Sequence, residues 1–370
     1  MSGTTIASAY AIATLVAALG LPRMGRFVDR YGVRRMLFVV ALLLGAACVA
    51  FGTIKGAPWL TLGFAALRFL GQGSLMLMCV VLVAQWFVRK RGFAMSLMAL
   101  GFSASMALHP PLAQWLVDLV GWRQAWLWLG VLTWVILLPL VFGVVHDKPE
   151  DCGLEPDGGA GPARGDSEPA LQDADAGLTL RAALRTSAFW IIAAGLFTLA
   201  MLITALFFFQ VSIFEVQGLT RQMAVQVFTV SGVVMILSMP LVGRALDRFP
   251  TRYVFAGALV LLTFTMVTAT LVNDVTTAVV YGALFGANNA ANITLFSYMW
   301  ARYFGRRHLG AIQGAGQMVG VVGASVGPLP LGIAFDLTGS YAEITLMLAV
   351  LPMICGVLAL FLRTPRGMTG

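Results

Sequence analysis

Arg68 is the one formal charge that lies well inside a long apolar stretch of this 370-residue chain. An arginine inside a membrane costs roughly 2.5 kcal/mol or more unless it faces a cavity or a partner. It could therefore hold an anion or handle a proton, or it could satisfy carbonyls at a helix interface. His109 is a second candidate proton carrier, because imidazole titrates near neutral pH. A histidine with a structural role is the alternative there.

Uncharged amide side chains occupy three other apolar stretches. Asn288 and Asn292 share a helix face, as do Gln313 and Gln317, while Gln210 follows three consecutive phenylalanines. Such amides could bind polar groups of a solute, or they could hydrogen-bond between helices. Together with the arginine and the histidine above, they form the predicted substrate and proton pathway.

The elements that must position these residues follow from composition. Apolar residues make up 59% of the chain and charged residues 11%, and the mean hydropathy is +0.87. Soluble domains have about 25% charged residues, so a soluble, disordered, collagen-like or disulfide-scaffold protein is excluded. Because a helix needs about 20 apolar residues to cross a bilayer, we predict an all-α integral membrane protein with eleven spans, at residues 5–24, 36–54, 60–87, 93–117, 125–145, 189–214, 224–245, 254–272, 276–303, 309–335 and 344–362.

A long polar segment divides the spans into two groups. Residues 146–187 contain nine of the sixteen acidic residues, with many glycines, prolines and alanines. This composition is typical of a flexible linker. We therefore predict an N-terminal half-bundle of five helices at 1–145, a cytoplasmic linker at 146–187 and a C-terminal half-bundle of six helices at 188–370.

The two halves repeat one another. The motif Gly-Arg-Phe-Val-Asp-Arg-Tyr at 25–31 recurs as Gly-Arg-Ala-Leu-Asp-Arg-Phe at 243–249, an offset of 218 residues. Three further matches, at 87–90, at Pro110 and at 118–121, recur at 217 or 218. The matches keep the same order and the same side of the membrane, which predicts two parallel, pseudo-symmetric bundles around a shared site.

The repeated motif suggests a gate. Gly25 would let two helices approach closely, and Asp29 could accept hydrogen bonds from the first amides of a neighbouring helix while pairing with Arg30 or Arg34. A contact available in only one conformation is what a switch requires. The alternative is that the arginines merely set topology, although topology needs no acid. The second copy lacks the basic pair and is expected to make a weaker contact. The predicted gating residues are Gly25, Asp29, Arg30, Arg34, Gly243, Asp247 and Arg248.

Orientation follows from the basic residues. Twenty of the 24 lysines and arginines lie in one set of alternate loops and three in the opposite set. The positive-inside rule places the first set in the cytoplasm. We expect a multi-pass protein of the inner (plasma) membrane whose C-terminus is cytoplasmic.

Residues 25–35, Gly-Arg-Phe-Val-Asp-Arg-Tyr-Gly-Val-Arg-Arg, resemble the cytoplasmic loop signature of the major facilitator superfamily, and Arg-Phe-Leu-Gly-Gln-Gly at 68–73 resembles its fourth-helix motif. The resemblance implies a twelve-helix fold, in which the fourth-helix arginine handles protons or substrate. The first motif follows the first span here, whereas it follows the second helix of the family. We therefore expect that the family's first helix is missing before Met1.

Further segments are similar to the bacterial monocarboxylate and oxalate/formate branch of that family: 86–92, 121–123, 149–157 and 303–310. Carriers of this branch have cationic residues in helices eight and eleven. The corresponding stretches 223–243 and 310–335 contain no lysine or arginine. An organic anion would therefore find only Arg68 as a fixed counter-charge, with a protonated His109 as the one possible addition.

The sequence thus predicts a secondary transporter that moves a small organic solute by alternating access, with a proton-coupled monocarboxylate as the leading substrate. An efflux carrier for drugs or metabolites, and a non-transporting receptor or inactive truncated remnant, are the alternatives. No nucleophile–base pair, metal cluster or nucleotide loop is apparent, so we expect neither an enzyme nor a cofactor. The expected partners are the solute, protons and the lipid bilayer, with no nucleic acid, for a monomeric chain.

Overall fold

The computed structural model describes residues 3–54, 56–158 and 177–365, and nearly all regular structure there is helical. One isolated bridge pairs Gly177 with Gly305. The N-terminal half comprises α1 (Gly3–Tyr31), α2 (Val33–Phe51), α3 (Ala57–Leu67), the π-helix η1 (Arg68–Leu75), α4 (Met76–Trp86) and α5 (Arg91–Gly143).

The linker and the C-terminal half follow. The linker contributes the short 3₁₀ helices η2 (Pro149–Cys152) and η3 (Pro156–Gly158) and the helical turn α6 (Leu180–Ala183). The C-terminal half comprises α7 (Ser187–Val216), α8 (Arg221–Arg248), α9 (Thr251–Thr270), α10 (Val275–Phe304), α11 (Leu309–Val326), α12 (Pro328–Thr338), α13 (Ala342–Leu348) and α14 (Val350–Leu360).

The helices are interrupted at two places where the conformational properties of glycine or proline explain the interruption. The 53-residue α5 contains two predicted spans, and it breaks at Gly121, whose φ of 79° is readily accessible to glycine. The predicted span 309–335 divides into α11 and α12 at Gly327 and Pro328. Proline has no N–H for the helix ladder, so α11 ends there and α12 begins.

Within the described residues, eight helical segments are long and apolar enough to cross a membrane. They correspond to eight of the eleven predicted spans. The other three predicted spans are also helical and lie in α1, in the first part of α5 and in α10. The all-helical membrane fold predicted from the sequence is confirmed.

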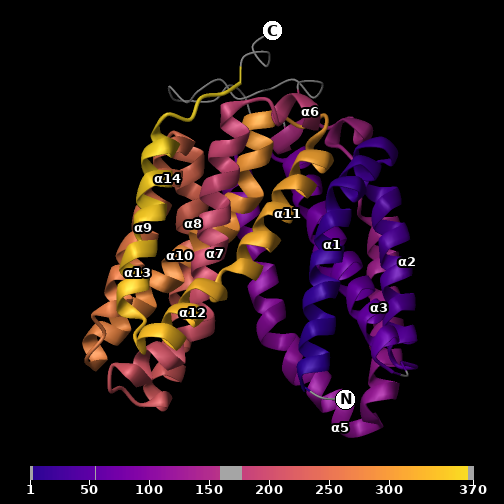
Figure 1. The fold of residues 1–370 in the computed structure, drawn as a ribbon. Helices are drawn as coiled ribbons and strands as arrows, with labels where there is room; N and C mark the ends of the chain where they lie inside the picture. Colours follow the sequence, from indigo (N-terminus) through magenta and orange to yellow (C-terminus); the bar gives the residue numbers. More distant parts are fainter. Residues whose placement is uncertain (1–2, 55, 159–176, 366–370) are drawn as a thin grey trace.

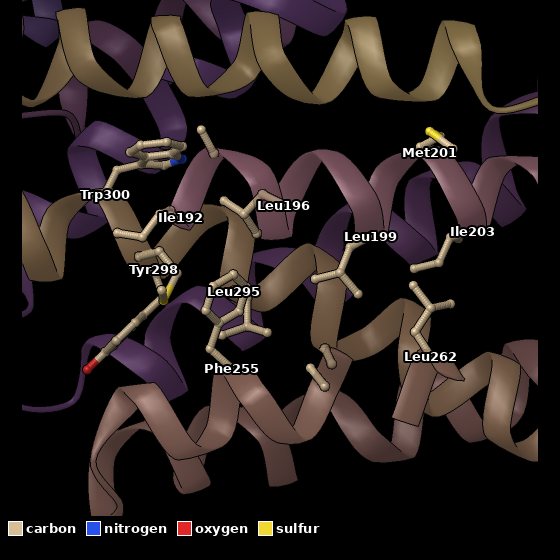
Figure 2. Packing of buried hydrophobic residues seen from close by; sticks show 14 of the residues in the cluster. Ile192, Leu196, Leu199, Met201, Ile203, Phe255, Leu262, Leu295, Tyr298 and Trp300 are labelled. Atoms are coloured by element: carbon tan, nitrogen blue, oxygen red, sulfur yellow. The ribbon is translucent and has the colours of Figure 1, made fainter. Parts of the chain in front are cut away.

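The core of the C-terminal half is built around α7. Figure 2 shows Ile192, Leu196 and Leu199 of α7 packed toward Phe255 of α9 and Leu295 of α10, and these five side chains are fully buried. This core is continuous across three helices. Its close packing fixes the positions of the side chains that these helices present toward the N-terminal half.

The two halves lie side by side and meet at the end of the molecule where α6 lies (Figure 1). The loops at this end contain the repeated motifs and the arginine-rich segments, so we call it the basic end. It is defined by residues 25–35, 87–92, 243–252 and 304–310. The residues that join the halves there are described next.

Candidate functional site

Asp29 joins the two halves at the basic end. It lies near the end of α1, and its carboxylate oxygens accept hydrogen bonds from the backbone N–H groups of Gly310 and Ala311, at 2.7 and 2.8 Å. These amides belong to the first turn of α11, where N–H groups have no partner within the helix. A carboxylate at a helix N-terminus also interacts favourably with the helix dipole. The acid of one half therefore caps a helix of the other.

Asp247 makes the same contact in the opposite direction. It lies near the end of α8 and accepts from the N–H groups of Gly92 and Phe93, at 2.7 and 2.9 Å, in the first turn of α5. The sequence predicts a weaker contact for the second copy, but the geometry of the two contacts is the same: both carboxylates accept two bonds, and their lengths agree within 0.1 Å. The basic pair Arg34-Arg35, which the second copy lacks, lies beyond the capping aspartate.

Glycine pairs allow this close approach, as predicted for Gly25. A Cβ atom added to Gly25 would overlap the carbonyl of Gly310 in the other half. The related pair repeats the arrangement, since a Cβ on Gly243 would lie 2.6 Å from the carbonyl oxygen of Gly92. Backbone carbonyls cannot move aside as side chains can. A larger residue at these positions would push the two backbones apart, so glycine favours closure of the basic end.

The predicted pairing of Asp29 with Arg30 or Arg34 is not made in this conformation, as far as the structure describes the chain. The Arg34 guanidinium donates instead to the carbonyls of Val141 and Phe142 at the end of α5, at 3.3 and 2.6 Å. Arg30 extends over the ring of Tyr31, 5.3 Å from its centroid. The arginines of the motif thus bind helix ends and aromatic rings within their own half.

A second connection between the halves centres on Arg306, which the sequence reasoning did not single out. This residue is 2% exposed. Its guanidinium donates to the side-chain and backbone oxygens of Gln85 on α4, at 2.9 and 2.5 Å, and Gln85 returns a bond to the Arg306 carbonyl. The same guanidinium forms an ion pair with Glu150 of the linker at 3.3 Å. The recurrence of the basic pair at 89–90 and 306–307 was the signal that could have found it.

The first part of the linker is held against the N-terminal half by hydrogen bonds. Asp157 accepts from the backbone N–H groups of Val88, Arg89 and Lys90. Asp147 accepts from the N–H of Arg34 at the start of α2. Acids in the first part of the linker therefore bind two sets of backbone amides at the basic end, a region for which the sequence predicted a flexible linker.

Arg68 begins the π-helix, about two turns into the predicted span 60–87. It donates to the side-chain oxygen of Gln72 one turn later. The backbone carbonyl of Gln72 accepts a hydrogen bond from the side-chain amide of Gln317 on α11 at 3.2 Å. This bond connects the two halves. Short π-helical segments are frequent at functional sites. The structure thus brings Arg68 and Gln317 together through Gln72.

The other predicted pathway residues are placed differently. Gln210, Asn288 and Gln313 donate to carbonyls of Ala224, Ala258 and Phe296 on neighbouring helices of the C-terminal half. These are the contacts expected if the amides serve helix packing. The side-chain oxygen of Asn292 is buried without a hydrogen-bond partner among the described residues.

His109 is exposed and lies close to its own helix. Its Nδ1 atom is 2.9 Å from the Ser105 hydroxyl and 3.3 Å from the Ser105 carbonyl. Both contacts are with a residue one turn earlier in the same helix, whereas Arg68 donates to Gln72.

The fold and the reciprocal contacts define a multi-pass helical membrane protein with two related halves. The family model for the Major Facilitator Superfamily matches residues 1–328 and, again, 218–369. The chain belongs to this superfamily.

Two curated relatives match part of the chain. A probable sulfoacetate transporter, SauU, of Cupriavidus necator is 28% identical over 130 residues, which is 34% of this chain and 29% of the relative. An MFS-type transporter, hasB, of Aspergillus fumigatus is 25% identical over 122 residues, which is 31% of this chain and 26% of the relative. The matched part thus spans little more than a quarter of each relative's length.

Solved structures share the fold over nearly the whole chain. The E. coli fucose:proton symporter FucP superposes with a TM-score of 0.69 at 13% identity, covering 98% of this chain and 91% of that one. The human organic anion transporter MFSD10 gives 0.67 at 16% identity, covering 96% and 83%. At these identities the likeness concerns the fold alone.

Proposed function

We propose that this chain is a secondary transporter of a small organic anion, with a monocarboxylate or a short sulfonated acid as substrate and a proton as the coupled ion. The observation that carries the proposal is Arg68, joined through Gln72 to Gln317 where the two halves meet. A guanidinium presents a fork of donors that matches a carboxylate or sulfonate. The similarity to a probable sulfoacetate transporter supports the same class of substrate.

The reciprocal aspartate contacts support alternating access. Both join the halves at the basic end, and both must separate before this end can open. We take the basic end as cytoplasmic, so the conformation described here is closed toward the cytoplasm. Substrate would enter from the opposite side, and opening of the basic end would release it.

Transport into proteoliposomes tests the proposal. Purified protein is assayed with radiolabelled lactate, oxalate, formate and sulfoacetate, with and without an inward-directed proton gradient. We expect uptake of at least one acid, stimulated by the gradient. Arg68→Gln should lower its kcat/KM by about a hundredfold or more, because charge-assisted bonds contribute about 1.5–3 kcal/mol each and a guanidinium can make two. Arg68→Lys should retain part of the activity.

The matched control is Arg123→Gln, which removes an exposed arginine from the opposite end of the molecule. Its uptake should equal that of the wild type. Uptake of an acid that is unchanged in Arg68→Gln would overturn the assignment of the site. Absence of uptake of every acid, with increased resistance of exporter-deficient cells to amphipathic compounds, would replace this function with efflux.

A further inference from the structure

A cavity of about 570 Å³ opens at the basic end, beside the Asp29 contact. Its wall combines one face of α1 with the linker turn α6 and the start of α11. Figure 1 shows α6 lying at this end, close to α1 and α11. The cavity therefore exists only while the N-terminal half contacts α11, which is the closed conformation described above.

Three guanidinium groups line this cavity. Arg26 and Arg30 are one turn apart on α1, and Arg181 lies on α6. All three residues are exposed, and none has a carboxylate within 4.0 Å among the described residues. The one acid in the wall, Asp29, already accepts two backbone amides. The three positively charged guanidinium groups around this cavity repel each other, and a bound anion would relieve the repulsion.

The remaining wall offers one more donor and an apolar surface. His308 lies at the start of α11, where burial and then the positive charge of Arg307 lower its pKa. This environment favours the neutral imidazole, which donates one N–H. Leu180 and Leu184 of the linker add apolar surface beside the arginines. A bare inorganic ion would leave this surface unused.

We propose that the cavity binds a phosphate group attached to an organic body, held by Arg26, Arg30 and Arg181 together. Arginine binds phosphate with parallel pairs of hydrogen bonds, and a phosphate has enough oxygens for several such donors. The group could come from a soluble phosphate ester or from a phospholipid headgroup. Because the cavity is made by both halves, the bound phosphate stabilises the closed basic end.

The test uses the full chain in two settings. In detergent, sn-glycerol 3-phosphate is titrated by calorimetry at constant ionic strength. In nanodiscs that contain phosphatidylglycerol and phosphatidylcholine, native mass spectrometry counts the phosphatidylglycerol molecules that stay bound. Saturable binding of the ester identifies a soluble source. Retention of phosphatidylglycerol without ester binding identifies a lipid source.

The decisive comparison is between Arg181→Gln and Arg185→Gln. Both remove an exposed arginine of the same linker segment, but Arg185 does not line the cavity. We expect Arg181→Gln to weaken ester binding roughly tenfold, or to lose one bound phosphatidylglycerol, while Arg185→Gln behaves as wild type. Equal behaviour of the two variants, or no binding in either setting, would overturn the proposal.

A third variant separates this site from the transport site. Arg68→Gln should bind the ester or the lipid as wild type does, because Arg68 lies within the span and outside the cavity. Loss of the phosphate in Arg68→Gln with retention in Arg181→Gln would place the binding at the transport site instead. The phosphate site can therefore fail while the transport function stands, and the reverse also holds.

Discussion

At each of two contacts between the halves, one aspartate carboxylate accepts hydrogen bonds from backbone amides. The strength of these hydrogen bonds depends on the negative charge of the carboxylate. An aspartate oxygen at a helix N-terminus forms charge-assisted bonds, which are about twice as strong as neutral ones. Asp29 and Asp247 each accept two of them. The matching geometry implies that both contribute equally to the closed basic end.

We therefore predict that Asp29→Asn and Asp247→Asn shift the molecule toward an open basic end by similar amounts. Asparagine keeps one acceptor but turns an NH₂ group toward an amide donor, so one bond is lost at a cost of about 1.5–3 kcal/mol. The open population should rise about tenfold or more relative to the closed one. Spin labels at Arg35→Cys and Arg307→Cys, in a Cys152→Ser background, report the separation of the halves.

The control is Asp336→Asn, which changes an exposed acid on α12. Its distance distribution should match the wild type. A large shift in Asp29→Asn with none in Asp247→Asn would show that the two contacts are unequal despite their geometry.

Gly25→Ala tests close approach without any change of charge. The new methyl group would overlap the Gly310 carbonyl, so closure should cost about 1–3 kcal/mol. The same pair of labels should then report a larger open population. Gly232→Ala is the matched control, because a Cβ there meets nothing within 4 Å. A closed Gly25→Ala protein would mean that α1 and α11 can separate slightly without opening the end.

At the scale of elements, the described first part of the linker, residues 146–158, is part of the packed structure. Its first turn places Glu150 on Arg306, while Asp157 binds the loop between α4 and α5. The linker therefore holds α4 and the end of α10 together. Arg306 is the residue on which this arrangement depends, because it bonds to α4 and to the linker at once.

We predict that Arg306→Met destabilises the protein by about 2–3 kcal/mol, since it leaves the Gln85 oxygen buried without its donor. Glu150→Gln should cost about 1 kcal/mol or less, because Glu150 is 37% exposed and can be hydrated. Thermal midpoints in detergent, followed by tryptophan fluorescence, give the order. Arg307→Met, which removes the exposed neighbour, should leave the midpoint unchanged. A midpoint for Arg306→Met equal to that of Arg307→Met would contradict this role.

At the scale of the whole molecule, the distribution of charge sets the direction of insertion. The four segments that define the basic end contain twelve of the 24 lysine and arginine residues, and loops rich in them stay in the cytoplasm. We predict that green fluorescent protein fused after Gly370 is fluorescent and that alkaline phosphatase fused there is inactive. The opposite pair of results would invert the orientation and would make the closed end external. A phosphatase fusion at Gly56, in the loop between α2 and α3, should be active.

The sequence alone determined the helical membrane fold, since long apolar runs admit no other solution in a bilayer. It also predicted the capping role of Asp29 and the need for Gly25, because a repeated acid and glycine have few other uses at a helix end. Only the tertiary structure decided which partners these residues meet. Arg34 binds the end of α5 and Asn288 binds α9, and the bonds of Arg306 to Gln85 span 221 residues of sequence. Such choices depend on how helices pack, because a side chain bonds to whichever group the neighbouring helix places within reach.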